Sequence, residues 1–417
     1  MRILILSQVF HPDVVAVAQY TTDLARDLAA AGYEVTVLAS QRAYDRPAQI
    51  YPKTERWNGI EIIRVLGTGL GKSSLWRRAI DFASVTLRYV AGLLTMPRYD
   101  VVVTLTVPPL VSFLGAVFTA IRGGRMVLWV MDLNPDQAIA AGVLRPDGWT
   151  ARVLAWMLHY SLARSAAVVV LDCFMRDRIV AKGVPESRVV VVPPWAQDSH
   201  IVWDEGGRAA FRRRHGLEDK FVVMYSGNHS PCHPLTSVLE AARLLSHRED
   251  IVFLFVGGGS GQDNVEEFAR EHRLTNVRQL PYQPLETLPA SLSAADLQVV
   301  SLGDPFRGIV HPSKIYNVLR LGVPFLYLGP MPSHVTELTP ESAVNEWAFF
   351  ARHGDVDKVV DSITMCAARG PYRSLREVEV AAAFSESVII PTLLRTIDPG
   401  YPMPVESQPA TEPVAGR

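Results

Sequence analysis

The sequence predicts an α/β protein with two doubly wound parallel sheets, and three observations lead to this prediction. The chain has 417 residues, more than one hydrophobic core usually supports, so two domains of about 200 residues each are expected. A strand, a helix and a second strand follow one another at residues 2–7, 18–31 and 34–39. The same order returns at residues 221–226, 235–245 and 251–256. The chain therefore starts a parallel sheet twice.

Apolar runs separated by helical segments continue the first sheet. Further strands are expected at residues 60–66, 101–105, 127–130 and 168–171. The stretch 193–217 breaks this pattern, because it is polar and contains Pro193-Pro194 and an arginine run, so it is interpreted as an interdomain connection. The predicted units are domains at 1–198 and 199–384, a helix at 385–398 that packs back toward the first domain, and a disordered, proline-rich tail at 399–417.

The segment 293–330 places a polar loop with one lysine between a buried strand and a helix. Leu297–Leu302 has the pattern of a strand, Ser313 is expected to cap the next helix, and Gly322 is expected to end it. Ligands bind outside the carboxyl ends of parallel strands, and a helix start with Lys314 beside it suits an anion such as a diphosphate. Taken alone, these residues leave open the alternative that Ser313 only caps and Lys314 is solvated.

Composition and charge fit a soluble enzyme. The chain is 48% hydrophobic and 20% charged, with a net charge of -1. Residues 1–198 hold 21 Lys/Arg against 16 Asp/Glu, so the first half is basic and could face an anionic membrane or an anionic lipid acceptor. The second half is acidic, and a difference of this size also arises by chance.

Cysteine usage and apolar runs predict a cytoplasmic location. The chain has 3 cysteines, which are far apart, and this argues against a disulfide framework and against a clustered metal site. The N-terminal residues resemble a first strand and not a signal peptide. The longest apolar stretch, residues 110–121, is shorter than the about 20 residues that a spanning helix needs.

Three glycine or acidic patterns are rejected as motifs. The run 67–73 lacks the glycine spacing of a phosphate-binding P-loop. Asp355 and Asp357 have the spacing of a nucleotide-sugar metal motif, but they open a helical run, so no metal is assigned to them. The loop 257–261 lacks both the dinucleotide-binding spacing and a helix start at the right place.

The segment 225–233, YSGNHSPCH, is a stronger candidate for phosphate binding. It follows the first strand of the second domain, where a strand-to-helix turn presents backbone N–H groups to an anion. Gly227 would let a phosphate approach the backbone, and His229 and His233 could donate hydrogen bonds to it. The alternative is that the two histidines and Cys232 fill a turn or bind a metal adventitiously.

The order of several motifs resembles the GT-B fold glycosyltransferases of family 4, which retain configuration and build bacterial surface polysaccharides, in particular their colanic-acid and O-antigen type. The resemblance covers nearly the whole chain. It rests on the segments His11-Pro12-Asp13, GYEVTVL at 32–38, WVMDLNPD at 129–136, YSGN at 225–228, FVGGG at 255–259, LPY at 280–282, PSKIYN at 312–317 and LGVP at 321–324.

The resemblance implies two Rossmann-like domains facing across a cleft, with the acceptor on the first and the nucleotide sugar on the second. Several positions depart from the family pattern. Two glutamates of many members are replaced by Ile309 and Asn317, and an acceptor-side histidine is replaced by Met131. The Arg and Lys that usually bind the diphosphate are replaced by the 229–233 stretch, so Lys314 gains importance.

Site residues follow from the resemblance and from the segments above. The expected catalytic residues are Asp132, Asp304 and Lys314. The expected donor-binding residues are Gly227, Asn228, His229, His233, Gly257, Gly258, Tyr282, Gln283, Ser313, Lys314 and Asn317. The expected acceptor-binding residues are His11, Gln19, Asp132 and Asp136. Asp132, Asp136, Asp304 and His11 could instead be loop caps. In the family the leaving phosphate helps to accept the acceptor's proton, and neither a cofactor nor a metal is expected.

The predicted function is a hexosyl- or N-acetylhexosaminyl-transferase acting on a saccharide or a polyprenyl-diphosphate-linked acceptor, without nucleic acid. Residues 72–98 contain five basic side chains against Asp81, so this helix could rest on anionic lipid at the inner face of the plasma membrane; a packed helix with a solvated side is the alternative. Competing interpretations are a nucleotide-sugar epimerase of GT-B shape, a phosphorylase-like enzyme, and a catalytically impaired nucleotide-sugar binder.

Overall fold

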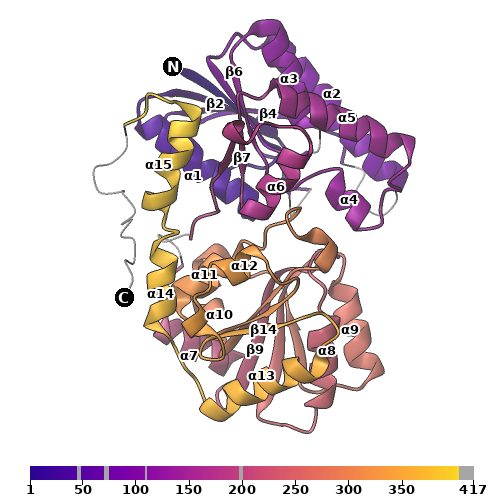
Figure 1. The fold of residues 1–417 in the computed structure, drawn as a ribbon, viewed down its shortest axis with the longest axis vertical. Coiled ribbons are helices and arrows are strands. Elements are labelled where there is room, and N and C mark those ends of the chain that lie inside the picture. Colours follow the sequence, from indigo (N-terminus) through magenta and orange to yellow (C-terminus); the bar gives the residue numbers. More distant parts are fainter. Residues whose placement is uncertain (45–47, 70–74, 109, 197–200, 403–417) are drawn as a thin grey trace, which may run out of the picture.

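The computed structural model describes residues 1–417 except 45–47, 70–74, 109, 197–200 and 403–417. It contains two α/β domains, one above the other, each with a sheet between helices (Figure 1). The prediction of two Rossmann-like doubly wound domains is therefore confirmed. The predicted tail lies mostly outside the described residues, and so does Lys72 of the predicted basic helix.

The first sheet has eight strands in the order β3-β4-β2-β1-β5-β6-β7-β8. Neighbouring strands are parallel except for β3 and β4. Strands such as β5 are buried at every position, as expected where helices cover both faces. The strands are Arg2–Leu6 (β1), Glu34–Ser40 (β2), Thr54–Trp57 (β3), Ile60–Val65 (β4), Val101–Thr104 (β5), Arg125–Trp129 (β6), Ala167–Val170 (β7) and Val189–Val191 (β8).

Helices cover the two faces of this sheet because successive side chains of a strand point to opposite sides. Ile3 and Ile5 pack with Leu24 of α1 on one face, and Leu4 and Leu6 belong to the core under α2 and α3 on the other. The helices of this domain are Ala16–Ala30 (α1), Leu75–Thr95 (α2), Val111–Arg122 (α3), Asp136–Ala140 (α4), Trp149–Arg164 (α5) and Cys173–Ala181 (α6), with a 3-10 turn at Glu186–Arg188 (η1).

The second sheet has six parallel strands in the order β11-β10-β9-β12-β13-β14. Its strands are Phe221–Asn228 (β9), Ile251–Gly258 (β10), Val277–Leu280 (β11), Leu297–Ser301 (β12), Phe325–Leu328 (β13) and Ala348–Ala351 (β14). Its helices are Glu205–Arg214 (α7), Thr236–Leu244 (α8), Gln262–Glu271 (α9), Leu288–Ser293 (α10), Lys314–Leu321 (α11), His334–Glu337 (α12), Val356–Arg369 (α13) and Leu375–Ala382 (α14). Short 3-10 turns lie at Leu285–Thr287 (η2), Asp304–Phe306 (η3) and Glu341–Ala343 (η4).

The polar stretch expected to be only an interdomain connection contains helix α7, so that interpretation was too broad. Asp204 caps this helix by accepting the backbone N–H of Gly207 at 2.8 Å. Arg212 from the arginine run is buried and pairs with Asp296 at 3.0 Å, which draws the helix onto the second domain. One arginine of the run is thus buried in an ion pair with Asp296, whereas Arg213 and Arg214 are exposed.

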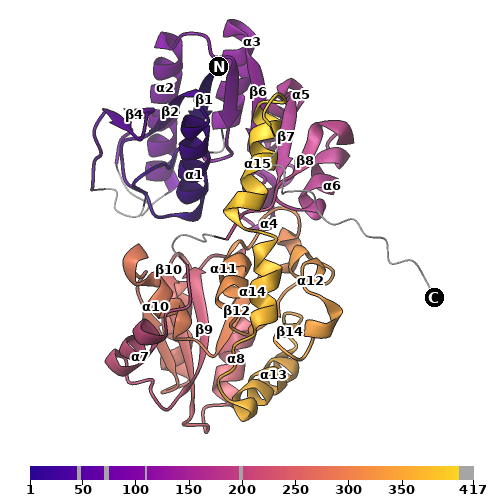
Figure 2. The same cartoon turned by 90° about the vertical axis from the view of Figure 1, so that its left-hand side faces the viewer.

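The chain returns to the first domain at its C-terminal end. Figure 2 shows α14 along the second domain and Glu386–Ile397 (α15) along the first. Helix α15 packs on α1, where Arg26 pairs with Glu386 and the Tyr33 hydroxyl donates to Asp398 at 2.6 Å. The two segments that cross between the domains pair with each other, since Ala196 N–H donates to the Phe384 carbonyl at 2.8 Å.

Within the described part of the chain, we find no helix that combines the length and the apolar character needed to cross a membrane.

Candidate functional site

Two glycine-containing turns meet at the carboxyl edge of the second sheet. Strands β9 and β10 end in register, with Gly227 opposite Gly257 and Asn228 opposite Gly258. Gly257 has φ +132°, and a Cβ on it would lie 2.1 Å from the Gly227 carbonyl oxygen, so only glycine fits. The loop then enters α9 directly at Gln262, which corrects the expectation that no helix starts there.

Lys314 points at this edge from the first residue of α11. Its Nζ lies 3.5 Å from the centre of the Tyr225 ring and would lie 3.0 Å from a Cβ on Gly227. The ammonium is buried and has no hydrogen-bond partner among the described residues. Burial lowers the pKa of Lys314 to about 7. Among the described residues, the Lys314 ammonium thus contacts an aromatic face and makes no hydrogen bond, and it lies beside backbone that a ligand can approach closely.

His229 lies next to Lys314 and is equally unpartnered. Both ring nitrogens are buried without a hydrogen-bond partner in the described structure, while its backbone N–H donates to the Gly258 carbonyl at 2.8 Å. Burial first, and then the charge of Lys314, lower the pKa of His229. His233 differs, because its Nδ1 is 2.7 Å from the Ser301 carbonyl and burial lowers its pKa to about 3. Of these two histidines, His229 is therefore the one with no hydrogen-bond partner at either ring nitrogen in the described structure.

Helix α11 also carries Ser313 and Asn317, and Gly322 ends it in the left-handed conformation, as predicted. The prediction that Ser313 is the N-cap residue of this helix is confirmed. Its hydroxyl makes no capping hydrogen bond and instead hydrogen-bonds to Tyr20 of α1 in the first domain. Asn317 is one turn beyond Lys314 and partly exposed.

Tyr282 and Gln283 lie beyond the end of β11 and differ in where their polar atoms point. The Tyr282 hydroxyl donates to the Gly258 carbonyl at 3.2 Å, and its ring lies against Gly258 and is 52% exposed. The Gln283 amide instead donates to the carbonyl of Pro281 in its own loop at 2.9 Å. The structure therefore brings Tyr282 to the strand edge and turns the side chain of Gln283 back.

Asp304 is exposed at the start of η3 and is not among the groups around Lys314. It lines a cavity of about 540 Å³, together with Pro231, Pro234, Phe306 and His353. The structure thus separates the expected sugar-contacting carboxylate from the buried cation.

The first domain places Asp132 against the second. Asp132 follows β6, its N–H donates to the Thr106 hydroxyl at 3.2 Å, and its backbone forms a bridge with Val310. Burial raises the pKa of Asp132 to about 6. Burial and, to a smaller degree, the charge of Asp132 raise the pKa of Cys232 in the 229–233 stretch. The carboxyl group therefore faces the loop that carries His229.

The other expected acceptor residues already have partners. Asp136 forms an ion pair with Lys182 at 2.8 Å. His11 stacks on Trp57 with ring centres 4.2 Å apart, and burial lowers its pKa. The Gln19 side chain donates to the carbonyl of Val14.

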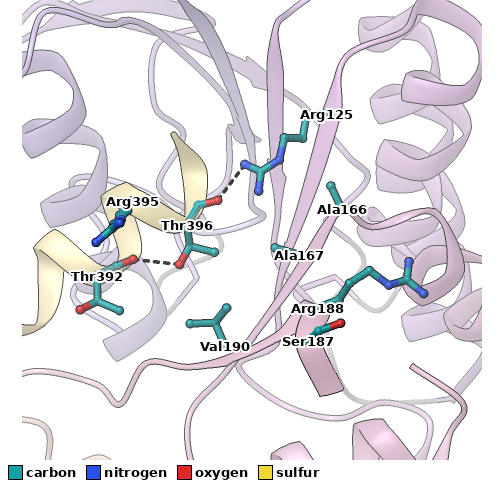
Figure 3. A pocket seen from close by; sticks show the side chains of 9 residues that line it. All are labelled: Arg125, Ala166, Ala167, Ser187, Arg188, Val190, Thr392, Arg395 and Thr396. Carbon is teal, nitrogen blue, oxygen red and sulfur yellow. Dashed lines mark hydrogen bonds between the residues drawn. The ribbon is translucent and has the colours of Figure 1, made fainter. Parts of the chain in front are cut away.

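A second cavity lies away from this edge. About 410 Å³ in volume, it is bounded by the starts of β6 and β7 and by α15, so it is at the amino ends of the strands. Arg125 donates there to the Thr396 carbonyl at 2.7 Å, and Figure 3 shows Arg188 and Arg395 on opposite sides of the space. Its cations do not converge on one point.

Of the described residues, one trio has the spacing of metal ligands, namely Asp172, His311 and His334. Nothing in the sequence pattern had grouped these three residues. His311 uses both ring nitrogens in hydrogen bonds, and its ring stacks on His334 at 3.8 Å. Imidazoles on one zinc ion point toward it from different directions, with Zn–N about 2.0–2.1 Å, and do not lie face to face. The geometry is therefore that of a hydrogen-bonded cluster.

The predicted acidic helix start at Asp355 is confirmed, since Asp355 caps α13 by accepting the N–H of Lys358 at 3.3 Å. Sequence reasoning missed Tyr20, Tyr225, Asp172 and His311. The signal for Tyr225 and His311 was their position beside Gly227 and Lys314, whereas nothing local marked Tyr20 or Asp172.

Comparisons with known proteins agree with this arrangement. The family described as "Glycosyl transferase 4-like domain" matches residues 16–195, and "Glycosyl transferases group 1" matches residues 207–310. A relative described as a colanic acid biosynthesis glycosyl transferase, WcaI of Escherichia coli (strain K12), is 26% identical over 77% of this chain and 82% of its own.

Two solved structures show the same fold. Sucrose-phosphate synthase from Thermosynechococcus elongatus has a TM-score of 0.72 at 16% identity, covering 95% of this chain and 98% of that one. HepE of Anabaena, solved in complex with UDP-glucose, has a TM-score of 0.65 at 16% identity, covering 95% and 97%. The two matching families occupy one domain each, in the order that the fold requires. The chain therefore belongs to the GT-B glycosyltransferases of family 4, and it resembles their colanic-acid and O-antigen type.

Proposed function

We propose that this glycosyltransferase moves a sugar, with retention, from a nucleotide sugar to a saccharide or polyprenyl-diphosphate-linked acceptor in bacterial surface polysaccharide assembly. One observation carries the donor half of the proposal. The ammonium of Lys314 and both ring nitrogens of His229 are buried without hydrogen-bond partners in the described structure, beside Gly227. Buried polar groups are rarely left unpaired, so this pair points to an anionic ligand.

In this proposal the diphosphate lies beside Gly227 and Lys314, and the base and ribose lie along Gly258 and Tyr282. Gly227 and Gly257 have no side chains of their own, so the ligand can approach their backbone next to Lys314. The fold shared with HepE, which was solved with UDP-glucose, supports a nucleotide sugar as the donor class.

The same groups would act on the leaving diphosphate. When the bond between the anomeric carbon and the phosphate oxygen breaks, negative charge grows on that oxygen, and the Lys314 ammonium stabilises it in a site shielded from water. The acceptor oxygen forms the new bond on the same face, and its proton passes to the leaving phosphate. Because Lys314 supplies the positive charge, we propose that the reaction needs no metal.

Asp132 is proposed to hold the acceptor hydroxyl from the side of the first domain, at the same face of the reacting carbon that the phosphate leaves. It faces the 229–233 stretch from the first domain, and positioning of a nucleophile can contribute several kcal/mol to a rate. Asp304 is proposed to contact the donor sugar only if its loop turns toward Lys314, since it now lies along a different cavity.

The acceptor side is proposed to rest on anionic lipid at the inner face of the plasma membrane. Helices α2, α3 and α5 form one layer, and its outer side carries Leu87 (68% exposed), Leu94 (67%), Ile121 (74%) and Trp149 (77%). The charged residues of α3 and α5 are all arginines, and α2 adds Arg77 and Arg88, both exposed. Exposed apolar and aromatic side chains mixed with arginine suit an anionic bilayer surface.

Liposome sedimentation tests this surface. We expect the protein to bind vesicles containing anionic lipid and not neutral vesicles, and Arg77→Glu with Arg88→Glu to release it. Arg243→Glu with Arg270→Glu, which changes exposed helical arginines of the second domain, is the control. Equal binding by both double variants would remove the membrane from the proposal.

Calorimetry with UDP-, GDP-, ADP- and dTDP-sugars tests the donor site. We expect one nucleotide class to bind the native protein and Lys314→Ala to weaken that binding at least about 100-fold, because a charge-assisted contact to a buried phosphate is lost. Lys358→Ala, an exposed lysine in the first turn of α13, is the matched control. If no sugar nucleotide binds the native protein, the proposed donor site is wrong.

Product analysis then separates the competing functions. A transferase releases nucleoside diphosphate only with an acceptor, an epimerase converts the nucleotide sugar alone, and a catalytically impaired binder does neither.

A further inference from the structure

A chain of buried hydrogen bonds crosses the domain interface next to the donor lysine. Asp172, at the N-cap of α6 in the first domain, accepts from His311 Nδ1 at 2.7 Å. His311 Nε2 lies 2.9 Å from the hydroxyl of Tyr316, a residue of α11. A carboxylate only accepts, so His311 Nδ1 carries a proton and donates to Asp172. The Tyr316 hydroxyl can donate or accept, so it pairs with His311 Nε2 in either protonation state of the ring, and the chain connects Tyr316 through His311 to Asp172.

A second histidine of the second domain, His334, packs against this cluster. The His334 ring stacks on His311 at 3.8 Å, and its Nδ1 lies 3.8 Å from the Asp172 carboxylate. Asp172 itself is held by the backbone N–H of Met175, which donates to its other oxygen at 2.7 Å. Each end of the hydrogen-bond chain is thus fixed to a helix start, α6 on one side and α11 on the other.

The first domain also contacts the loop that leads into α11, through hydrogen bonds and a close backbone approach. Arg178 donates to the carbonyl of Arg307 at 2.8 Å, and Leu133 N–H donates to the carbonyl of Ile309 at 3.0 Å. A Cβ on Gly308 would lie 2.6 Å from a backbone oxygen of the first domain. The route from η3 to Lys314 therefore runs along the surface of the other domain.

We propose that Asp172 is a positioning residue: through His311 and Tyr316 it holds the first turn of α11, so that Lys314 points at Gly227 only when the two domains are together. The importance of this for catalysis rests on the proposed donor site, but the coupling itself does not. A merely structural Asp172 would stabilise the interface without controlling Lys314.

Amine labelling of the full-length protein tests the coupling without any nucleotide. The protein is treated briefly with an amine-reactive acetylating reagent, and mass spectrometry gives the labelling rate of Lys314 relative to the other lysines. Asp172→Leu removes the acceptor at similar size, whereas Asp172→Asn keeps one. We expect Lys314 to label at least fivefold faster in the leucine variant and within twofold of native in the asparagine variant. Asp177→Leu, an exposed acid on the same helix, should leave the rate unchanged.

Each other outcome counts against the proposal. An unchanged Lys314 rate in Asp172→Leu overturns it, even if the melting temperature falls, because the role would then be structural only. Faster labelling of the native protein after chelator treatment would also overturn it, since a metal and not the hydrogen-bond chain would hold the cluster.

Calorimetry with UDP-glucose and the other sugar nucleotides then connects the coupling to function. Whichever sugar nucleotide binds the native protein should bind Asp172→Leu about tenfold more weakly and Asp172→Asn within threefold. If no sugar nucleotide binds the native protein, the proposed donor site is wrong, but the labelling result still decides whether Asp172 positions Lys314.

Discussion

The two edges that face each other across the domain interface are built in opposite ways. On the second domain, the Lys314 ammonium and the His229 ring are buried without hydrogen-bond partners in the described structure, against backbone stripped of side chains at Gly227 and Gly257. On the first domain, Asp136 is paired with Lys182, and His11 is stacked on an aromatic ring. On the proposed donor side, buried polar groups thus lack hydrogen-bond partners in the described structure. On the proposed acceptor side, Asp136 and His11 already have partners.

Under the proposed donor assignment, this difference predicts where specificity resides. A diphosphate is common to all nucleoside-diphosphate sugars, so a cradle of glycines and one cation can serve any of them. Acceptors vary in shape, and their contacts must come from loops whose polar groups exchange partners on binding. The following predictions test this contrast, beginning with the largest effect.

Gly257→Ala should damage the donor edge most. The new Cβ would lie 2.1 Å from the Gly227 oxygen at φ +132°, so β9 and β10 must separate, at a cost of about 3 kcal/mol. Gly370→Ala, at φ +81° with nothing within 4 Å, should cost only about 1 kcal/mol. Urea denaturation measures both. Equal losses would show that backbone strain and not the close strand approach matters at Gly257.

Donor affinity should decrease as the pH rises above about 7. The pKa of Lys314 is about 7 in the free protein, and a bound diphosphate raises it by restoring a counter-charge. Binding above pH 7 therefore takes up a proton, and affinity falls by up to about tenfold per pH unit. Calorimetry in buffers of different ionisation enthalpy counts this proton. Zero uptake at pH 8 would mean that Lys314 is charged before the donor arrives.

Lys314→Met should stabilise the unliganded protein. The unfolded chain holds the lysine proton up to about pH 10, and the folded protein releases it near pH 7, so native stability rises with pH across that window. Below pH 7 the full cost of burying the charge is present. We expect the free energy of unfolding of the methionine variant to be about 2 kcal/mol higher at pH 6.5, a figure reduced because Lys314 keeps some contact with solvent. The stability of this variant should no longer rise between pH 7 and pH 10. Lys358→Met should retain the slope, and a flat native profile would contradict the prediction.

Two carboxylates of the first domain should respond with opposite signs. The folded protein keeps the Asp132 proton up to about pH 6 and the unfolded chain only to about 4, so its stability contribution falls across that range. At pH 7 Asp132→Asn should gain about 1 kcal/mol, discounted because Asp132 retains some exposure. Asp136→Asn should lose about 0.5 kcal/mol, since it breaks a partly exposed ion pair. Melting temperatures at pH 7 distinguish the two variants. If both changes shift the melting temperature in the same direction, burial of the ionised Asp132 does not destabilise the protein.

The sequence was sufficient for the central strands of both sheets and for the glycine turns beside Lys314. Periodicity predicted β1, α1, β2, β9, α8 and β10, and Gly322 ended α11 as expected, because these features depend on local pattern and backbone conformation. Strands β3, β8, β11 and β14 were not predicted, since each has only three or four residues and lies at the edge of its sheet.

Side-chain partners across the domains were beyond local pattern. Ser313 looked like a helix cap, yet it bonds to Tyr20, nearly 300 positions away. The His311 contact with Asp172 spans 139 positions. Arg212 of the arginine run is buried because it pairs with Asp296, which is also far away in the sequence. Such contacts are set by tertiary packing, which no window of the sequence contains.

The paired crossing segments have a mechanical consequence. Ala196 and Phe384 are hydrogen-bonded where the chain leaves the first domain and where it returns, so the two crossings are joined at that point. Neither crossing can shift there without carrying the other with it. We therefore expect any relative movement of the two domains to displace both crossings together.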